Sequence, residues 1–286
     1  MKKLLSALAA CSLCSTAALA ASAYLTAPGQ LSVQPTYSHQ WARDFWFNDT
    51  PFSLSGDLVQ DTAGLDGQWG IAPGVALDWS VAYSTVTYEG GTVAGLELTQ
   101  NGKQHRSGIA DSNLGLSFNL SDEFASPSDA TPTISARIGG IIAGNYDTGF
   151  LNAPGDGASG VEFGLLFGKF FPLLNGGVYG DLGYRWLSSD TPDAWLGSVG
   201  AYKILGPITL SAGLREYHSV DGLDILGPGF TLDRFTAVRE INRSYEAGLT
   251  WRQSDRNSFS VGYAHTFEGE NTPKKSVVVL AGNLLF

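Results

Sequence analysis

Apolar and polar residues alternate along much of this chain, in stretches of roughly ten residues. One stretch places Val75, Leu77, Trp79, Val81 and Tyr83 on one side, and Ala76, Asp78, Ser80, Ala82 and Ser84 on the other. The same pattern returns at 177–187, 208–215 and 244–251. A period of two indicates β-strands with one apolar face and one mostly small or polar face. The sequence therefore predicts an all-β protein built from amphipathic strands.

About twelve strands are predicted, at 31–43, 60–71, 75–88, 108–120, 133–144, 160–171, 177–187, 194–205, 208–217, 240–252, 257–267 and 276–286. The connections after even strands are short, as at Ala72-Pro73-Gly74 and Gly206-Pro207, and only 121–132 is longer. The connections after odd strands are mostly long, at 44–59, 89–107, 145–159, 188–193, 218–239 and 268–275. Short turns at one end and long loops at the other are typical of outer-membrane barrels.

A soluble β-sandwich would show the same alternation, so the end of the chain has to separate the two classes. The last residues, 276–286, form an apolar strand that ends in Phe286. In a soluble protein such a strand would be an aggregation risk. A terminal strand that ends in phenylalanine resembles the assembly signal of Gram-negative outer-membrane proteins. We therefore predict a closed antiparallel transmembrane β-barrel, with Phe286 as the assembly signal and the barrel-assembly machinery and outer-membrane lipid as partners.

The first 23 residues have the features of a secretory signal peptide. Lys2 and Lys3 precede an apolar run, and Ala18-Leu19-Ala20 and Ala21-Ser22-Ala23 both fit a small-x-small cleavage site. Both cysteines, Cys11 and Cys14, lie in this segment, so cleavage after it leaves no disulfide and no thiol-ligated metal. The less favoured alternatives are a retained membrane helix and lipidation at Cys11. We assign 1–23 to the signal peptide and 24–286 to the barrel.

Composition narrows the possible functions. The formal charge is −10, which argues against a nucleic-acid partner because phosphate binding needs a basic surface. The histidines His39, His105, His218 and His265 lack metal-ligand spacing, so no cofactor or metal is expected. An enzyme is not expected either, because Ser38, Ser260 and His265 form no serine–histidine relay.

The polar face of the strands would line the lumen. It carries Asp66, Asp78, Asp111, Glu162, Asp181 and Glu246, together with Arg137, Arg185, Arg215 and Arg252. A charge facing lipid at the midplane would cost about 2–4 kcal/mol, so these ten residues on one face support the register. Lys169 is the exception, near enough to a turn to snorkel. The charges either fill a narrow barrel structurally or form a constriction that filters a solute.

The long loops are unusually apolar. They hold Phe45, Trp46, Phe47 and Phe52 in one region and Phe230 and Phe235 in another. A large apolar patch does not face water without a reason. These residues either fold into the barrel mouth or collect a hydrophobic solute.

Several short motifs follow one another in a family-like order: Ser107-Gly-Ile-Ala-Asp111, Gly144-Asn-Tyr-Asp147, Gly155-Asp-Gly157, Gly168-Lys169 and Leu182-Gly-Tyr-Arg185. The order and spacing resemble the outer-membrane transporter family of phenol meta-degradation pathways in proteobacteria. The resemblance implies an outer-membrane barrel that moves aromatic or hydrophobic compounds, and it carries over no functional residues.

These observations predict a barrel that lets a small, hydrophobic or aromatic solute cross the outer membrane passively. The alternative is a non-transporting structural or envelope-assembly barrel whose lumen is sealed by its charge pairs. A barrel hydrolase is the third and least favoured class.

Overall fold

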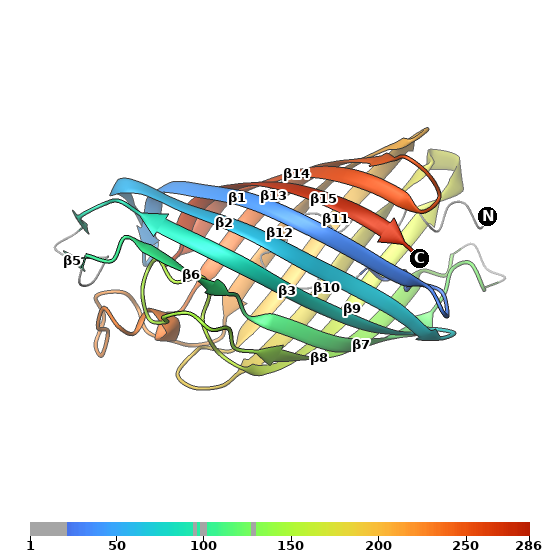
Figure 1. The fold of residues 1–286 in the computed structure, drawn as a ribbon. Helices are drawn as coiled ribbons and strands as arrows, with labels where there is room; N and C mark the ends of the chain where they lie inside the picture. The colour runs from blue at the N-terminus through green and yellow to red at the C-terminus, as the bar shows by residue number, and fades with distance from the viewer. Residues whose placement is uncertain (1–21, 94–95, 98–101, 127–129) are drawn as a thin grey trace.

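The computed structural model describes residues 22–93, 96–97, 102–126 and 130–286. Their strands are β1 (Leu31–Phe47), β2 (Thr50–Ala72), β3 (Val75–Tyr88), β4 (Thr92–Val93), β5 (Leu96–Glu97), β6 (His105–Ile109), β7 (Ser112–Ser121), β8 (Thr133–Ile142), β9 (Gly160–Phe171), β10 (Gly176–Leu187), β11 (Ala194–Leu205), β12 (Ile208–Ser219), β13 (Ile241–Arg252), β14 (Asn257–Glu270) and β15 (Pro273–Leu285). Two short 3-10 helices, η2 (Pro172–Leu174) and η3 (Phe235–Ala237), lie in connections. Figure 1 shows the long strands as a tilted barrel.

The strand pairing closes the barrel. β1 pairs with both β2 and β15, so the two ends of the chain meet in the wall. β6 and β7 pair with different parts of β3, and together they occupy one strand position of the barrel wall. We call each such strand position a stave. Counted in this way, the described barrel has twelve antiparallel staves, and β4 and β5 form a separate small hairpin. The prediction of a closed antiparallel barrel of about twelve strands is confirmed.

The two ends of the barrel differ in their connections. Phe286 exchanges backbone hydrogen bonds with Leu31, and Pro28 bridges Gly70, so the C-terminus and the first described residues share one end, called here the terminal end (Figure 1). The connections at the terminal end are 73–74, 172–175, 206–207 and 253–256, plus the longer 122–132. The opposite end, the loop end, carries the long connections 89–104, 143–159 and 220–240 and the shorter 188–193. No helix in the described ranges is long and apolar enough to span a membrane.

Two connections predicted as long loops are strand instead. β1 and β2 continue to a turn at Asn48-Asp49, so the predicted loop 44–59 is a hairpin. β14 and β15 continue to a turn at Asn271-Thr272, inside the predicted loop 268–275. Both loop predictions were wrong because the paired strands extend beyond the membrane, where neither face has to be apolar. The alternation of apolar and polar residues therefore does not identify these parts as strands. Asn48 and Asn271 have positive φ, as tight hairpin turns require.

The two faces of the wall match the predicted register. Exposed large apolar side chains point outward from successive strands, among them Leu65, Val81, Leu114, Ile138, Leu165, Leu182, Val199, Leu214, Leu249 and Val261. Charged side chains are buried inside, including Arg137, Glu162 and Glu246. Lys169 faces outward near the terminal end, where its ammonium lies 3.1 Å from the Glu123 carboxylate. Apolar exposure outside and charge burial inside reverse the pattern of a soluble protein, as a lipid-facing wall requires.

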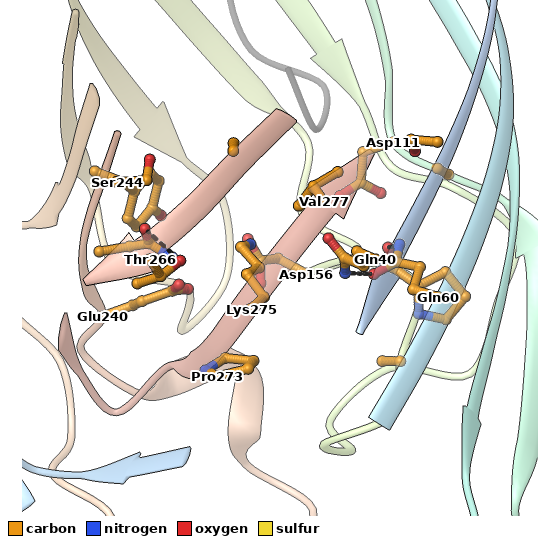
Figure 2. Close-up of a pocket in the computed structure, with 18 of the residues that line it drawn as sticks. Gln40, Gln60, Asp111, Asp156, Glu240, Ser244, Thr266, Pro273, Lys275 and Val277 are labelled. Carbon is orange, nitrogen blue, oxygen red and sulfur yellow. Dashed lines mark hydrogen bonds between the residues drawn. The ribbon is translucent and has the colours of Figure 1, made fainter. Parts of the chain in front are cut away.

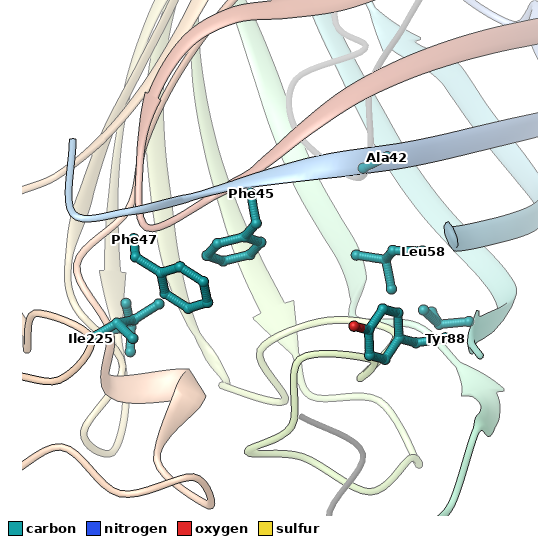
Figure 3. Close-up of a cluster of buried hydrophobic side chains, with 8 residues drawn as sticks. Ala42, Phe45, Phe47, Leu58, Tyr88 and Ile225 are labelled. Atoms are coloured by element: carbon teal, nitrogen blue, oxygen red, sulfur yellow. The ribbon is translucent and has the colours of Figure 1, made fainter. Parts of the chain in front are cut away.

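Two buried apolar clusters occupy the ends of the lumen. At the loop end, Phe45 and Phe47 from β1 pack with Leu58, Tyr88 and Ile225 (Figure 3). At the terminal end, Tyr24 packs with Phe170, Tyr202 and Ile204. The Tyr24 hydroxyl donates to Glu123 at 2.6 Å. Segments outside the strands therefore narrow the barrel at both ends. Most of the predicted signal peptide, with Cys11 and Cys14, lies outside the described residues.

Candidate functional site

A ladder of ion pairs lines one side of the lumen. Arg137 on β8 donates from Nε to Asp78 on β3 at 2.7 Å and from Nη1 to Glu162 on β9 at 2.7 Å. Glu162 also accepts a 2.6 Å hydrogen bond from Arg185 Nε on β10, and its side chain is 0% exposed. Arg137 also contacts Asn113 on β7. These residues come from five consecutive staves, so the ladder runs along the wall rather than across the lumen.

Two inward glycines make room for this ladder. A Cβ at Gly115 would lie 2.5 Å from Arg137 Nη2, and one at Gly139 would lie 2.8 Å from Nη1. The guanidinium therefore lies close to the backbone of β7 and β8. At these two positions a guanidinium occupies the space that a side chain would otherwise fill.

The other predicted lumen charges lie apart from the ladder. Arg215 on β12 lies 3.4 Å from Glu246 on β13, and Asp181 on β10 accepts a hydrogen bond from Ser198. Asp66 is opposite Ser80 in the pairing of β2 with β3. Arg252 is the last residue of β13, at the terminal end. The ten predicted residues thus form one ladder, one pair and several separate positions, not a single ring.

Asp111 has a different setting from the other lumen acids. It lies in the break between β6 and β7 and accepts hydrogen bonds from Gly144 N at 2.8 Å, Tyr146 Oη at 2.7 Å and Gly157 N at 3.2 Å. All three donors belong to the connection 143–159. Burial and the hydrogen bond to Asp111 raise the pKa of Tyr146, so its hydroxyl stays a donor. Asp111 therefore anchors this connection, called here the infolded loop, to the wall.

A second anchor holds the middle of the infolded loop. Arg106 on β6 donates to Asn152 Oδ1 at 3.0 Å, lies 3.6 Å from the ring centroid of Phe150, and forms a 2.9 Å ion pair with Asp147. Asn152 is fully buried and donates to the carbonyls of Lys103 and Gln104. The hydrogen bond from Lys103 lowers the pKa of Asp147, so this carboxylate stays charged at neutral pH.

The infolded loop, which joins β8 to β9, extends into the lumen and reaches β2. The side-chain nitrogen of Gln60, on β2, donates to the carbonyl of Pro154 at 3.4 Å. A Cβ at Gly149 would lie 2.3 Å from the carbonyl of Asp233, so this loop also meets the connection 220–240. The loop therefore constricts the lumen. In the sequence, Gly155-Asp-Gly157 stood out only as a family-like motif, and this role was not predicted.

Two adjoining cavities remain around the infolded loop. The larger, of about 340 Å³, lies in the lumen and reaches Arg185 and Arg215 (Figure 2). The smaller, of about 150 Å³, lies toward the loop end and is lined by Phe45, Phe150 and Phe235 among others. Both are lined by Asp156, Glu240, Tyr217, Leu151, Ala153, Gly155 and Pro273. We call this shared lining the neck.

The predicted collecting aromatics lie mostly inside the loop-end mouth. Phe45, Trp46 and Phe47 are buried on β1 rather than displayed on a loop, whereas Phe52 is 40% exposed. Phe230 and Phe235 pack edge-to-face, with centroids 5.5 Å apart, against the loop-end cluster. Of these six residues, only Phe45 and Phe235 line the smaller cavity.

The histidines contact residues on the wall. His39 lies 2.8 Å from Asp61, His105 2.9 Å from Thr87, and His265 2.9 Å from Ser276. Ser260 pairs with Thr250 instead of His265. Within the described ranges no group of three or more metal-ligating side chains comes together.

Comparison with solved structures places this geometry among membrane barrels. The chain is similar to the COG4313 outer membrane channel from Pseudomonas putida F1, with a TM-score of 0.71 and 14% identity over 92% of this chain and 97% of that one. The fold is that of a Gram-negative outer-membrane β-barrel. The NanC porin is similar at a TM-score of 0.50 and 8% identity, over 89% of this chain and 98% of that one. No protein-family model and no curated protein matches the chain.

Proposed function

We propose that this chain is a passive channel of the Gram-negative outer membrane, through which small solutes diffuse along the lumen past the infolded loop. The observation that carries the proposal is the pair of adjoining cavities, which extends from the loop end to the level of Arg185. A volume of about 340 Å³ is in the range of pockets that hold small molecules.

The lining of the larger cavity supports small solutes with an apolar body. Apolar side chains on several staves face it, including Leu58, Val86, Ile141, Leu196 and Val277, and polar groups such as Gln60 and Ser244 lie between them. Phe45 and Phe235 line the smaller cavity in front of it. We infer that hydrophobic or aromatic solutes enter through this aromatic mouth, in line with the family resemblance of the sequence.

The alternative of a sealed structural barrel is less well supported. The Arg137 ladder joins neighbouring staves along the wall, so its ion pairs leave the lumen uncrossed. The infolded loop does extend into the lumen, and the Tyr24 cluster narrows the terminal end. On our proposal these segments limit the rate and size of passage. We further propose that Phe286 is recognised during assembly into outer-membrane lipid.

Conductance tests the proposal. The purified barrel in planar lipid bilayers should show discrete current steps in salt solution, and Asp111→Ala should enlarge them. The substitution removes hydrogen bonds to a charged acceptor, each worth about 1.5–3 kcal/mol, so the infolded loop loses its wall anchor. Asp57→Ala is the matched control, because Asp57 is exposed and pairs with Arg43. A wild-type barrel that inserts without conducting would contradict the channel proposal and favour the sealed barrel.

A further inference from the structure

Asp156 lies at the neck, where the two cavities meet. It belongs to the infolded loop and lines both cavities, and Figure 2 shows its side chain within the larger one. Its side chain is exposed to the lumen, and no hydrogen bond or ion pair to its carboxylate is found from any residue of the described ranges. A solute moving between the cavities passes this carboxylate.

The charges around the neck are unbalanced. Arg185 pairs with Glu162 and Arg215 pairs with Glu246, so the charge of each guanidinium is partly neutralised within the wall. Glu240 accepts from the Thr272 hydroxyl, a neutral donor.

Asp111 also receives only neutral donors from the infolded loop. Arg185, Arg215 and Lys275 line the larger cavity but not the neck, and Arg185 and Lys275 partly offset the charge of Asp156. Among the residues that line the neck, Asp156 and Glu240 carry carboxylates and none carries a cationic group. The neck therefore has a negative potential, which a confined low-dielectric passage concentrates.

We propose that Asp156 is the selectivity residue of the passage and favours small cations and cationic organic solutes over anions of the same size. This inference rests on the proposed channel function and adds a charge class to its solutes. The apolar lining accommodates the body of such a solute, and the carboxylates of Asp156 and Glu240 attract its positive charge. Lys275 keeps the site from holding a cation so tightly that passage stops.

The selectivity should depend on pH. Desolvation inside the barrel, with the nearby carboxylates of Glu240 and Asp111, raises the pKa of Asp156 to about 6, while Arg185 and Lys275 oppose the shift. The charged and titratable groups that face Asp156 across the neck are Glu240 from the connection 220–240, Asp111 from the β6–β7 break, Arg185 from β10, Tyr217 from β12 and Lys275 from β15. Asp156 is charged above its pKa, so cation preference should be full at pH 8 and weaker at pH 5.

The experiment is a reversal-potential measurement across a potassium chloride gradient in planar bilayers. Wild type should favour K⁺ over Cl⁻, and Asp156→Asn should reduce that permeability ratio by roughly 2–10-fold, within the range by which local charge concentrates counter-ions. Asp156→Glu should keep the preference. Asp57→Asn removes the same charge on the outer face and should leave the ratio unchanged.

The pH arm isolates Asp156 from the other acids. The wild-type ratio should fall between pH 8 and pH 5, whereas Asp156→Asn should be insensitive. A conducting wild type whose ratio is unchanged by Asp156→Asn would overturn the inference and leave the channel proposal standing, as would a variant that keeps the full pH dependence. A wild type that does not conduct would overturn the channel proposal and this inference with it.

Discussion

Replacing Glu162 by alanine should destabilise the barrel by about 3–5 kcal/mol, the usual result of removing one partner from a buried ion pair. Its carboxylate accepts 2.7 and 2.6 Å hydrogen bonds from Arg137 and Arg185, and its side chain has no exposed surface. The Arg137 side chain is only 4% exposed, and the variant removes one of its hydrogen-bond acceptors. Urea unfolding of the barrel in liposomes, monitored by tryptophan fluorescence, measures the decrease in the free energy of unfolding.

A surface ion pair provides the control for Glu162. Glu216 pairs with Arg243 at 3.2 Å, but both side chains are roughly 40% exposed. Exposed pairs contribute about 0–1 kcal/mol, so Glu216→Ala should leave stability nearly unchanged. Equal decreases in the free energy of unfolding for the two variants would mean that the ion pairs of the ladder are as hydrated as the surface pair. The ladder would then contribute no more to barrel stability than a surface pair does.

An arginine at position 214 should destabilise the membrane-inserted barrel by about 2–4 kcal/mol, as a charge facing lipid near the midplane does. Leu214 is exposed on the outer face in the middle of β12, opposite Val199 and Tyr245. Leu210→Arg, on the same face, should cost only about 0–1 kcal/mol, because interfacial positions tolerate cations. Leu210 is close to the turn at 206–207 and opposite Lys203.

Ser211→Arg tests the opposite face of the same strand. Ser211 points inward, so the substitution should permit insertion and alter conductance. Folding yield into bilayers, read as the heat-modifiable band on gels, compares the three variants. Insertion of Leu214→Arg together with failure of Ser211→Arg would mean that the two faces are inverted.

The wall was predictable from sequence because lipid imposes a strict alternation on each strand. Asp78, Glu162 and Arg185 could be placed inward on this ground alone, since an outward charge would be costly. Outside the membrane the lipid no longer requires one apolar face. For that reason the strand segments around Phe45 and Glu268 were predicted as loops. The aromatic run Phe45-Trp46-Phe47 does not alternate, although it continues a paired ladder.

The constriction could not be predicted, because it depends on contacts between distant positions. Asp111 was expected among the lumen charges, but nothing local shows that Gly144 and Gly157 donate to it. Asp156 and Glu240 were not among the candidate residues. An acid between two glycines in a long loop has the sequence signature of a solvent-facing turn, and only the fold places it at the neck.

A cysteine-blocking measurement tests the central claim, passage through the lumen, most directly. The described ranges contain no cysteine, so a single introduced thiol is the reactive site there. Ser244 on β13 lines the larger cavity, whereas Ala247 on the same strand faces outward. A charged methanethiosulfonate reagent should reduce the single-channel current of Ser244→Cys and leave that of Ala247→Cys unchanged. Full current through Ser244→Cys after complete modification, verified by mass spectrometry, would contradict a solute path through this lumen.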